Sequence, residues 1–577
     1  MTAAAGDQIK TVFTMGHLGL VGAFIRETGI IESIDSMVPE SSDNPGPLTH
    51  GQVAALLILN WFGGADPHLK SSFFEARDAE AILGITFDNS WYSDDVIAHT
   101  LDALHASGLT PLFSRIASEV MKRLGCKIGS VTADSIGFRC QNEEQPRRAD
   151  RAGNDYDEPR RIAVTYGYNG DSCPEAVQIR AQVLTDSVTG MPLCLEPEGN
   201  ANDTCSGGPD NNDSAANDTA AFSRMIKVFE SFRNYCGDSG VYLSGDDSLY
   251  TEEQVTFMAG KGIKFAAEVD GKRKSAQDFI AARRDVPLEN ITDEYQGRLY
   301  AVNDCGVRQI WLLAQSAAAA AKNAHAAESS AAKEKDKLRK LITDYDSTYY
   351  TSEKEAQKEL QKFRKKCRYC QIVSSAIVKE EIPGKDRKSK KPGADSQKEF
   401  RCRLDITIEI NREYCDMVAR TKSLFVVATN DAERQWTPGE LLKLYNPRNK
   451  KERAAGWEWQ FLKNSAFFAD RVFAAGNERI RTLLMIMTLG LLVSRGLEWK
   501  LRKALETSEV LFKKPAGQIT GKISLGYVFQ IFRPVMTIVS ENGERKFCNL
   551  DEQALKILEL LGAGYQKAYG ACDADDA

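Results

Sequence analysis

The order of strands and helices expected between residues 126 and 247 constrains the fold more than any other feature of this 577-residue chain. Strands show as short runs in which apolar residues are continuous or alternate with polar ones, whereas a helix repeats its apolar residues every three or four positions. These patterns predict strands at 127–135, 163–168, 176–185 and 191–195, then a helix at 220–235 and a further strand at 240–247. Because turn residues separate the first strands, we expect an antiparallel meander.

Two of the expected strands end in carboxylates. Asp134 closes the first strand, and the adjacent pair Asp246 and Asp247 closes the last. A meander of strands, then a helix and a further strand that lies beside the first, is the order of a ribonuclease-H-like fold, which is of the mixed α/β class. In that fold the two acidic tips come together. Either aspartate alone would be an ordinary turn or cap residue, so the prediction depends on their joint placement.

A helical stretch nearer the C-terminus offers a third acid. Thr437 and Glu440 have the spacing of a capping box, and Asn446 followed by Pro447 marks a second helix start. A carboxylate surrounded by cations suits a protein that holds a metal close to phosphates. One carboxylate and two cations of this stretch lie within about 60° of one another on an ideal helix: Glu452, Arg448 and Lys463.

The length of the chain predicts several structural units, since a single core rarely serves so many residues. Apolar residues recur at helical spacing before residue 125, with Thr49 and Ser93 placed as helix caps. We therefore expect an all-α N-terminal domain (1–125), the first part of a ribonuclease-H-like core (126–260), an insertion with strands, a long helical arm and a basic loop (261–435), the second part of the core with the acidic helix (436–512), and a C-terminal strand pair and helix (513–577).

Composition limits the possible partners and the compartment. The net charge is −6, so contacts with nucleic acid must come from local basic patches. Thirteen scattered cysteines favour a reducing cytoplasm over a disulfide framework. The first residues lack the basic and apolar regions of a signal peptide. The longest apolar run, 483–493, is shorter than the roughly 20 residues that a bilayer requires, so we expect a buried core helix and no membrane partner.

A series of short motifs follows in one order along nearly the whole chain: ADS at 133–135, TYGYNGD at 165–171, GNAND at 199–203, DDSLYT at 246–251, ATN at 428–430, FLKNSAFF at 461–468 and ERIRTLLMIMTLGLLV from 478. Each motif is weak singly, but their order is specific. In this order they resemble bacterial insertion-sequence transposases of the IS1634 group, within the larger IS4-like DDE class. The stretch SDDVIAHTLDAL at 93–104 resembles the domain that precedes the catalytic core in that group.

This resemblance implies metal-dependent DNA cleavage and strand transfer at the ends of a mobile element. It implies two Mg²⁺ (or Mn²⁺) ions held by carboxylates, which are the hard oxygen ligands these ions prefer. The implied partners are double-stranded DNA, as inverted-repeat ends and target, and further copies of the chain on that DNA, near the bacterial nucleoid. The matching metal and catalytic positions are Asp134, Asp246 and Glu452, and those for DNA contact are Tyr445, Arg448 and Lys463.

The sequence departs from the family pattern at the third acid. The family spacing Tyr-x2-Arg-x3-Glu-x6-Lys holds from Tyr445 to Glu452, but Lys463 lies four residues too far along. An insertion near 454–457 restores the match and puts Gly456 inside the helix, at a cost of about 1 kcal/mol relative to alanine. The alternative ligands are Glu458 for the third acid and Asp247 for the second.

The segment between the second and third acids is much longer than a minimal fold requires. Residues 317–366, rich in Ala, Lys and Glu, predict an exposed helical arm, and 379–403 predict a basic loop that either contacts phosphates or is merely solvated. Cys367 and Cys370 have the spacing of a zinc ligand pair, but no second close pair follows, which disfavours zinc. In the tail we expect a strand pair at 527–532 and 535–539.

Three functions fit these observations. The first is an active DDE transposase, and the second is a DNA-binding protein of the same family whose cleavage has decayed, as the displaced Lys463 suggests. The third is a metal-dependent nuclease without strand transfer. Cleavage of the element's own ends separates the first from the second, and joining of a cut 3′ end to target DNA separates the first from the third.

Overall fold

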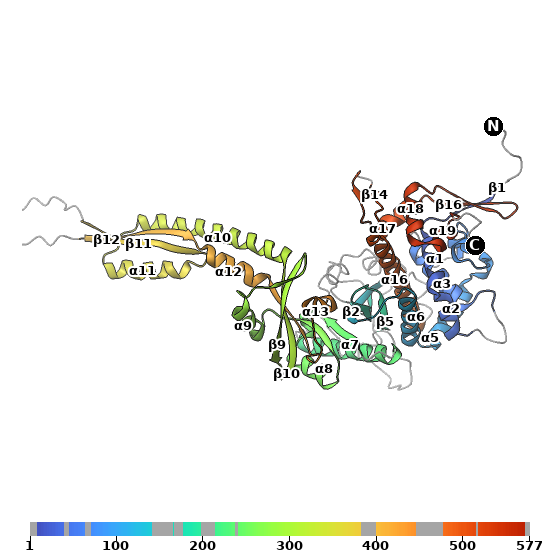
Figure 1. The fold of residues 1–577 in the computed structure, drawn as a ribbon, viewed down its shortest axis with the longest axis horizontal. Helices are drawn as coiled ribbons and strands as arrows, with labels where there is room; N and C mark the ends of the chain where they lie inside the picture. The colour runs from blue at the N-terminus through green and yellow to red at the C-terminus, as the bar shows by residue number, and fades with distance from the viewer. Residues whose placement is uncertain are drawn as a thin grey trace, which may run out of the picture. The chain divides into compact units, whose positions relative to one another are not determined.

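The chain forms two compact units in a computed structural model (Figure 1). The first comprises Met1–Gly245, Phe257–Ala266 and Lys443–Ala577, and the second comprises Asp246–Thr256 and Ala267–Leu442. Both combine helices with sheet, so the expected mixed α/β class is confirmed. The residues whose structure is described are 9–39, 46–63, 71–140, 165–166, 177–197, 214–236, 240–381, 400–445, 477–514 and 517–571.

The first unit holds the strands and the helix expected after residue 126. They are β2 (Ser130–Cys140), β3 (Thr165–Tyr166), β4 (Val177–Asp186), β5 (Pro192–Pro197), α7 (Ser214–Cys236) and β6 (Tyr242–Gly245). β4 pairs antiparallel with both β2 and β5, and β6 pairs parallel with β2. The strand order is therefore β5-β4-β2-β6. A parallel pair requires a crossover connection, and α7 lies in the chain between β5 and β6.

Helices of the N-terminal region surround one long helix, α16 (Asn477–Glu506). α16 packs on α3 (His50–Gly63) and α5 (Asp94–Ala106), and its run from Leu483 to Val493 is buried. The span Arg481–Glu506 is long and apolar enough to cross a bilayer, but 89% of its apolar 18-residue window is buried inside the protein. The expected core helix is confirmed. The other helices here are α1 (Leu18–Thr28), α2 (Ile30–Met37), α4 (Ala79–Leu83) and α6 (Leu109–Arg123).

Close packing between α16 and α3 depends on a glycine. A Cβ atom placed on Gly490 would lie 2.5 Å from Cε3 of the buried Trp61, closer than real Cβ atoms approach. We therefore expect Gly490→Ala to lower the free energy of unfolding by about 2 kcal/mol, as overpacking usually does. Urea denaturation measures this. Gly564→Ala is the matched control, because α19 leaves open space there and alanine should stabilise that helix by about 0.5 kcal/mol.

The two ends of the chain share one small sheet. β1 (Ile9–Thr14) pairs with β16 (Met536–Ser540), which pairs with β17 (Arg545–Cys548). β1 lies in a region for which the sequence predicted only helices. The expected strand at 527–532 is wrong, because these residues belong to the helix α17 (Leu525–Phe532). Other C-terminal elements are β14 (Phe512–Lys513), β15 (Ile519–Thr520), α18 (Glu552–Leu561) and α19 (Ala563–Ala568).

Polar contacts, one of them fully buried, join these end segments. The Tyr569 hydroxyl donates to the Gly16 carbonyl at 2.7 Å, across 553 residues of sequence. Arg545 of β17 donates from Nε to Asp78 Oδ2 and from Nη2 to Glu80 Oε2, each at 2.7 Å. Asp78 is itself the N-cap of α4 and accepts from the Ala81 amide at 3.0 Å. The helices near the N-terminus therefore obtain part of their core from the last residues of the chain.

His17, at the N-cap of α1, makes the stability of this region depend on pH. Its ring lies 4.2 Å from the Phe529 ring, and burial lowers its pKa to about 4. Because the folded pKa lies below the ordinary value, the unfolded chain binds the proton first as the pH falls from 6.5 to 4. Over that window we expect a loss of up to about 3 kcal/mol of unfolding free energy. Urea midpoints across this range measure it, and His17→Gln should remove this share of the pH dependence.

The second unit contains a sheet with the order β13-β10-β9-β8, in which neighbouring strands are antiparallel. Its strands are β8 (Glu289–Thr292), β9 (Tyr295–Asp304), β10 (Val307–Ser316) and β13 (Leu424–Thr429). Trp311, Leu312 and Leu313 of β10 are buried. β7 (Phe265–Val269), α8 (Glu252–Gly260) and α9 (Lys274–Arg283) precede these strands in the chain.

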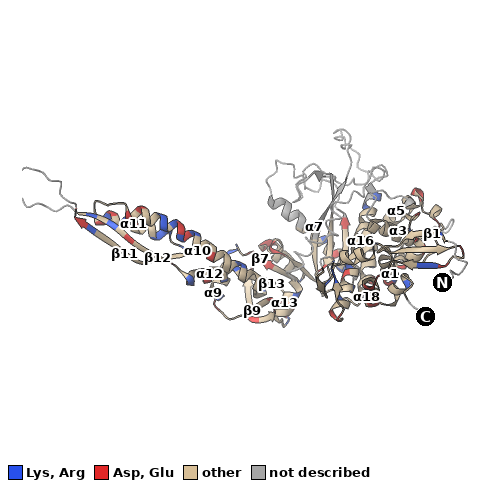
Figure 2. Ribbon diagram, turned by 90° about the horizontal axis from the view of Figure 1, so that it is seen from above, with Lys and Arg blue, Asp and Glu red and all other residues tan. Residues whose placement is uncertain are grey.

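A hairpin with helices along it forms the rest of the second unit (Figure 1). α10 (Ala317–Asp346) and α11 (Glu353–Lys366) confirm the expected helical arm, although six residues interrupt it. They pack on β11 (Cys370–Glu381) and β12 (Phe400–Ile410), and α12 (Arg412–Ser423) follows. Lysines, arginines and acids alternate along both arm helices, as on a solvated surface (Figure 2).

The arm corrects the prediction of a basic loop at 379–403. Residues 379–381 and 400–403 belong to paired strands, with Lys379 opposite Cys402, while 382–399 lie outside the described residues. Cys370 and Cys402 pack in the apolar core beneath the arm helices. Burial raises the pKa of the Cys370 thiol to about 11, which disfavours a metal-binding thiolate.

Candidate active site

The candidate active site is built on the parallel pair of β2 and β6 in the first unit. Thr132 of β2 is the register partner of Ser244 of β6. Asp134 follows Thr132 by two residues, and Asp246 follows Ser244 by two residues. Asp134 lies within β2, opposite Val183 of β4, and the strand continues to Cys140. The prediction that Asp134 ends its strand is therefore wrong, because pairing with β4 extends β2 beyond it. Asp134 and Asp246 therefore each lie two residues after a member of the register pair Thr132 and Ser244.

The helix that leads toward the third acid ends against the same two strands. α13 (Pro438–Tyr445) begins at the predicted capping box, in which the Thr437 amide donates to Glu440 Oε2 at 2.9 Å. At its other end, the Ser130 hydroxyl donates to the Leu444 carbonyl at 2.9 Å. The Ser244 hydroxyl donates to the Tyr445 carbonyl at 3.3 Å. One serine from each strand thus satisfies a carbonyl that the helix itself leaves unpaired.

Asp246 has a local structural task as well. It is the N-cap of a short 3-10 turn, η3 (Asp247–Leu249), and its Oδ1 accepts from the Ser248 amide at 3.1 Å and from the Ser248 hydroxyl. Leu249 and Tyr250 are buried directly after this turn, whereas Asp247 is exposed. The turn fixes Asp246 more firmly than Asp247, which favours Asp246 of the two alternatives weighed from the sequence.

The remaining predicted site residues are only partly covered by the structure. Tyr445 is the last residue of α13 and is half-buried. Within the described ranges, no group of three or more His, Cys, Asp or Glu side chains could hold a metal ion. The side chain of Asp134 and four other residues of the expected site lie outside those ranges: Arg448, Glu452, Glu458 and Lys463.

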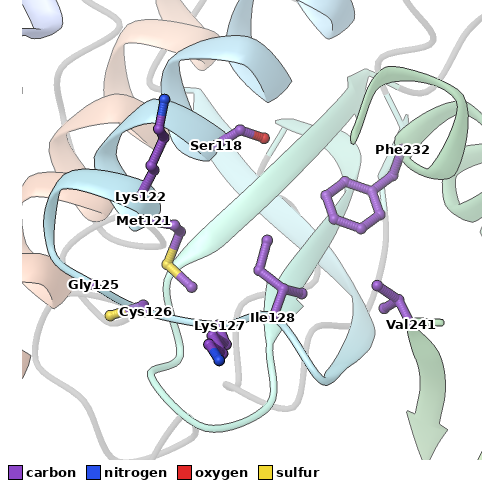
Figure 3. A pocket seen from close by; sticks show the side chains of 9 residues that line it. All are labelled: Ser118, Met121, Lys122, Gly125, Cys126, Lys127, Ile128, Phe232 and Val241. Atoms are coloured by element: carbon purple, nitrogen blue, oxygen red, sulfur yellow. The ribbon is translucent and has the colours of Figure 1, made fainter. Parts of the chain in front are cut away.

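A cavity of about 380 Å³ lies in the same unit but at the other end of these strands (Figure 3). Its lining includes Lys127 and Ile128, just before β2, and Val241, just before β6. Ligands of open α/β sheets bind outside the carboxyl ends of strands, whereas this cavity lies at the amino ends of β2 and β6. Burial raises the pKa of Cys126, which also lines this cavity, to about 11, so its thiol is not a ready nucleophile.

Sequence reasoning missed the residues that hold this site in place. Ser130 and Ser244 bond α13, and nothing in their sequence surroundings distinguishes them from other strand serines. Tyr250 was visible only as part of the motif DDSLYT, without a role. Its hydroxyl donates to Asp304 Oδ2 at 3.0 Å. Asp304 precedes the two-residue turn Cys305-Gly306, and a glycine in such a turn is a hairpin signal.

Comparisons with known proteins give limited matches. Residues 9–118, from β1 into α6, match the model of a domain of unknown function, DUF4277, which is found in transposase-like proteins. No curated protein matches the chain. Among solved structures, the piggyBac transposase in a synaptic complex with hairpin DNA is similar at 11% identity and a TM-score of 0.22. That match covers 51% of this chain and 57% of the other, and a likeness this weak defines neither fold nor activity.

Proposed function

We propose that this chain is a DDE transposase, which cleaves DNA at the ends of an insertion sequence and joins them to target DNA. The observation that carries the proposal is the register of β2 and β6, from which Asp134 and Asp246 follow at equal steps. Alternate residues of a strand face the same side, so these two positions would share one side of the parallel pair. The strand order β5-β4-β2-β6 agrees with the order that the sequence predicts for a ribonuclease-H-like core, which supports the same proposal.

The third ligand in this proposal is Glu452, supplied by the segment after α13. Ser130 and Ser244 hold the last carbonyls of α13 against the two acidic strands, so the chain leaves toward Glu452 from beside the proposed site. Glu452 follows Tyr445 by seven positions in the sequence. The residues proposed to contact DNA are Tyr445, Arg448 and Lys463.

The donor set fits Mg²⁺ or Mn²⁺, because three carboxylates are hard oxygen ligands without soft or imidazole donors. Asp134, Asp246 and Glu452 would hold a pair of such ions, which would supply an activated water or 3′-hydroxyl and charge stabilisation of the leaving oxygen. The residues of this chain orient that chemistry. The η3 cap holds the backbone after Asp246, the β2 ladder holds Asp134, and the two serines hold α13.

A cleavage assay tests this function. The substrate is DNA that carries the inverted repeats flanking the coding sequence, incubated with Mg²⁺, with Mn²⁺ or with EDTA. We expect metal-dependent nicks at the repeat ends, followed by joining of the new 3′ ends to a target plasmid. Cleavage without joining would indicate a nuclease, and specific binding to the repeats without cleavage would indicate a DNA-binding protein that has lost its activity.

A further inference from the structure

A buried hydrogen-bond network in the second unit ends four residues after Asp246. Its centre is the hydroxyl of Tyr250, a residue that is 2% exposed. The hydroxyl lies 3.0 Å from Asp304 Oδ2 and 2.7 Å from Gln309 Oε1, so both oxygens share its proton. Burial, with the charge of Asp304, raises the pKa of this hydroxyl far above its usual range, so it remains a donor.

The acceptors are themselves held from several sides. Gln309 is fully buried; its Oε1 also accepts from Trp311 Nε1 at 2.9 Å, and its Nε2 donates to the Asp304 carbonyl at 3.0 Å. The guanidinium of Arg273 lies 3.5 Å from Asp304 Oδ2 and donates to the Cys305 sulfur at 3.0 Å. The network therefore has little freedom to rearrange.

The network is anchored on a rigid hairpin. Asp304 ends β9 and faces Val307 of β10 across a two-residue turn. Cys305 and Gly306 in that turn have φ values of +53° and +71°, the left-handed pair that a tight hairpin requires. Cys305 is one of two such non-glycine residues among the described parts of the chain. β10 in turn pairs with β13, so Asp304 is attached to the middle of the sheet.

We propose that Tyr250 and Asp304 are positioning residues, which fix the turn carrying Asp246 to the β9–β10 hairpin so that its carboxylate is held ready to bind metal. The segment 246–250 is short, is capped at one end by Asp246 and is tied at the other by Tyr250. This inference rests on the proposed function, since it concerns the same carboxylate. The inference gives a role to the β9–β10 hairpin, which belongs to the segment between the second and third acids: the hairpin holds Asp246 in place.

Tyr250→Phe tests the proposal, because it keeps the ring against Trp311 and removes only the hydroxyl. Two measurements are needed. The first is amide hydrogen exchange at 246–250, and the second is Mn²⁺ binding, monitored by electron paramagnetic resonance. We expect amide exchange at 246–250 to become at least about tenfold faster, while β10 and β13 exchange as before. The Mn²⁺ dissociation constant should rise about tenfold, as it usually does when a residue that supports a metal ligand is removed. The cleavage rate at saturating metal should change less than the affinity.

Two further variants complete the test. Asp304→Asn keeps an oxygen acceptor for Tyr250, so both the exchange rate and the Mn²⁺ affinity should stay within about threefold of the wild type. Asp304→Ala removes the acceptor and should have the same effects as Tyr250→Phe. If Tyr250→Phe fails to fold, Asp304→Ala takes its place in the test. Tyr527→Phe is the matched control, because it removes another phenol, whose hydroxyl donates to the Lys513 carbonyl in the first unit.

The outcomes separate this inference from the proposed function. Unchanged exchange at 246–250 in both Tyr250→Phe and Asp304→Ala would overturn the positioning role, whatever the DNA assay shows. Faster exchange together with unchanged Mn²⁺ affinity would also overturn it, since the turn would then not serve the metal. If the wild-type chain binds no Mn²⁺ and cleaves no DNA, the proposed function fails, while exchange still reports whether Tyr250 anchors the turn.

Discussion

Asp134→Asn is expected to lower the rate of Mg²⁺-dependent cleavage of the element's ends by about 10³-fold or more, equivalent to about 4 kcal/mol of transition-state stabilisation. Asp246→Asn should do the same. Asparagine is as good a helix cap as aspartate, so this variant keeps the bonds to Ser248 and removes only the charge. Single-turnover cleavage measures the rate, and circular dichroism checks the fold.

Two aspartates serve as controls for this experiment. Asp270 accepts from the Lys272 amide at 2.8 Å, a local bond like that of Asp246, and Asp270→Asn should leave the rate within about threefold of the wild type. Asp247→Asn decides between adjacent acids, because a large loss there and none in Asp246→Asn would move the ligand by one residue. Retention of metal-dependent cleavage in both Asp134→Asn and Asp246→Asn would end the DDE proposal.

Arg545→Met is expected to lower the free energy of unfolding of the first unit by about 4 kcal/mol, because it leaves a buried carboxylate unpaired. The Asp78 side chain is only 3% exposed, and its partner Arg545 reaches it from β17. Asp78 and Glu80 together raise the pKa of Arg545, so the guanidinium remains charged in every ordinary buffer. Urea denaturation measures the loss.

The matched control is Lys556→Met, which removes a cation from an ion pair of similar length. Lys556 lies 2.6 Å from Glu552 on the surface of α18, and that carboxylate is 83% exposed. Its loss should cost no more than about 0.5 kcal/mol. If both variants lose the same small amount, the contact between β17 and α4 does not stabilise the N-terminal helices.

Local features of the fold were predictable because neighbouring residues determine them. Ser93 caps α5 and Thr437 with Glu440 caps α13, as expected, since a cap is a contact within four residues. The strand that carries Asp134 and the strand that leads to Asp246 were recognised in the same way, from short runs of strand-forming residues. At the candidate site, these local patterns identified the two aspartates, but they placed Asp134 at the end of its strand and showed no contact between distant segments.

The features that were missed depend on distant partners. The run 527–532 is apolar on nearly every residue, so its period does not distinguish a strand from a buried helix, and the cap at Ser524 decides in favour of α17. β1 is a strand only because β16 pairs with it. The bonds from Ser130 and Ser244 to α13 cross 314 and 201 residues, which no local pattern reports.

The shared sheet of the two chain ends has a consequence for synthesis on the ribosome. β1 is translated long before its partner β16, because almost the whole described chain lies between these two strands. Until then the nascent N-terminal helices expose the surface that Tyr569 and Arg545 later cover. A message cut short before β16 would yield a product with an unfinished core, which quality-control proteases would remove.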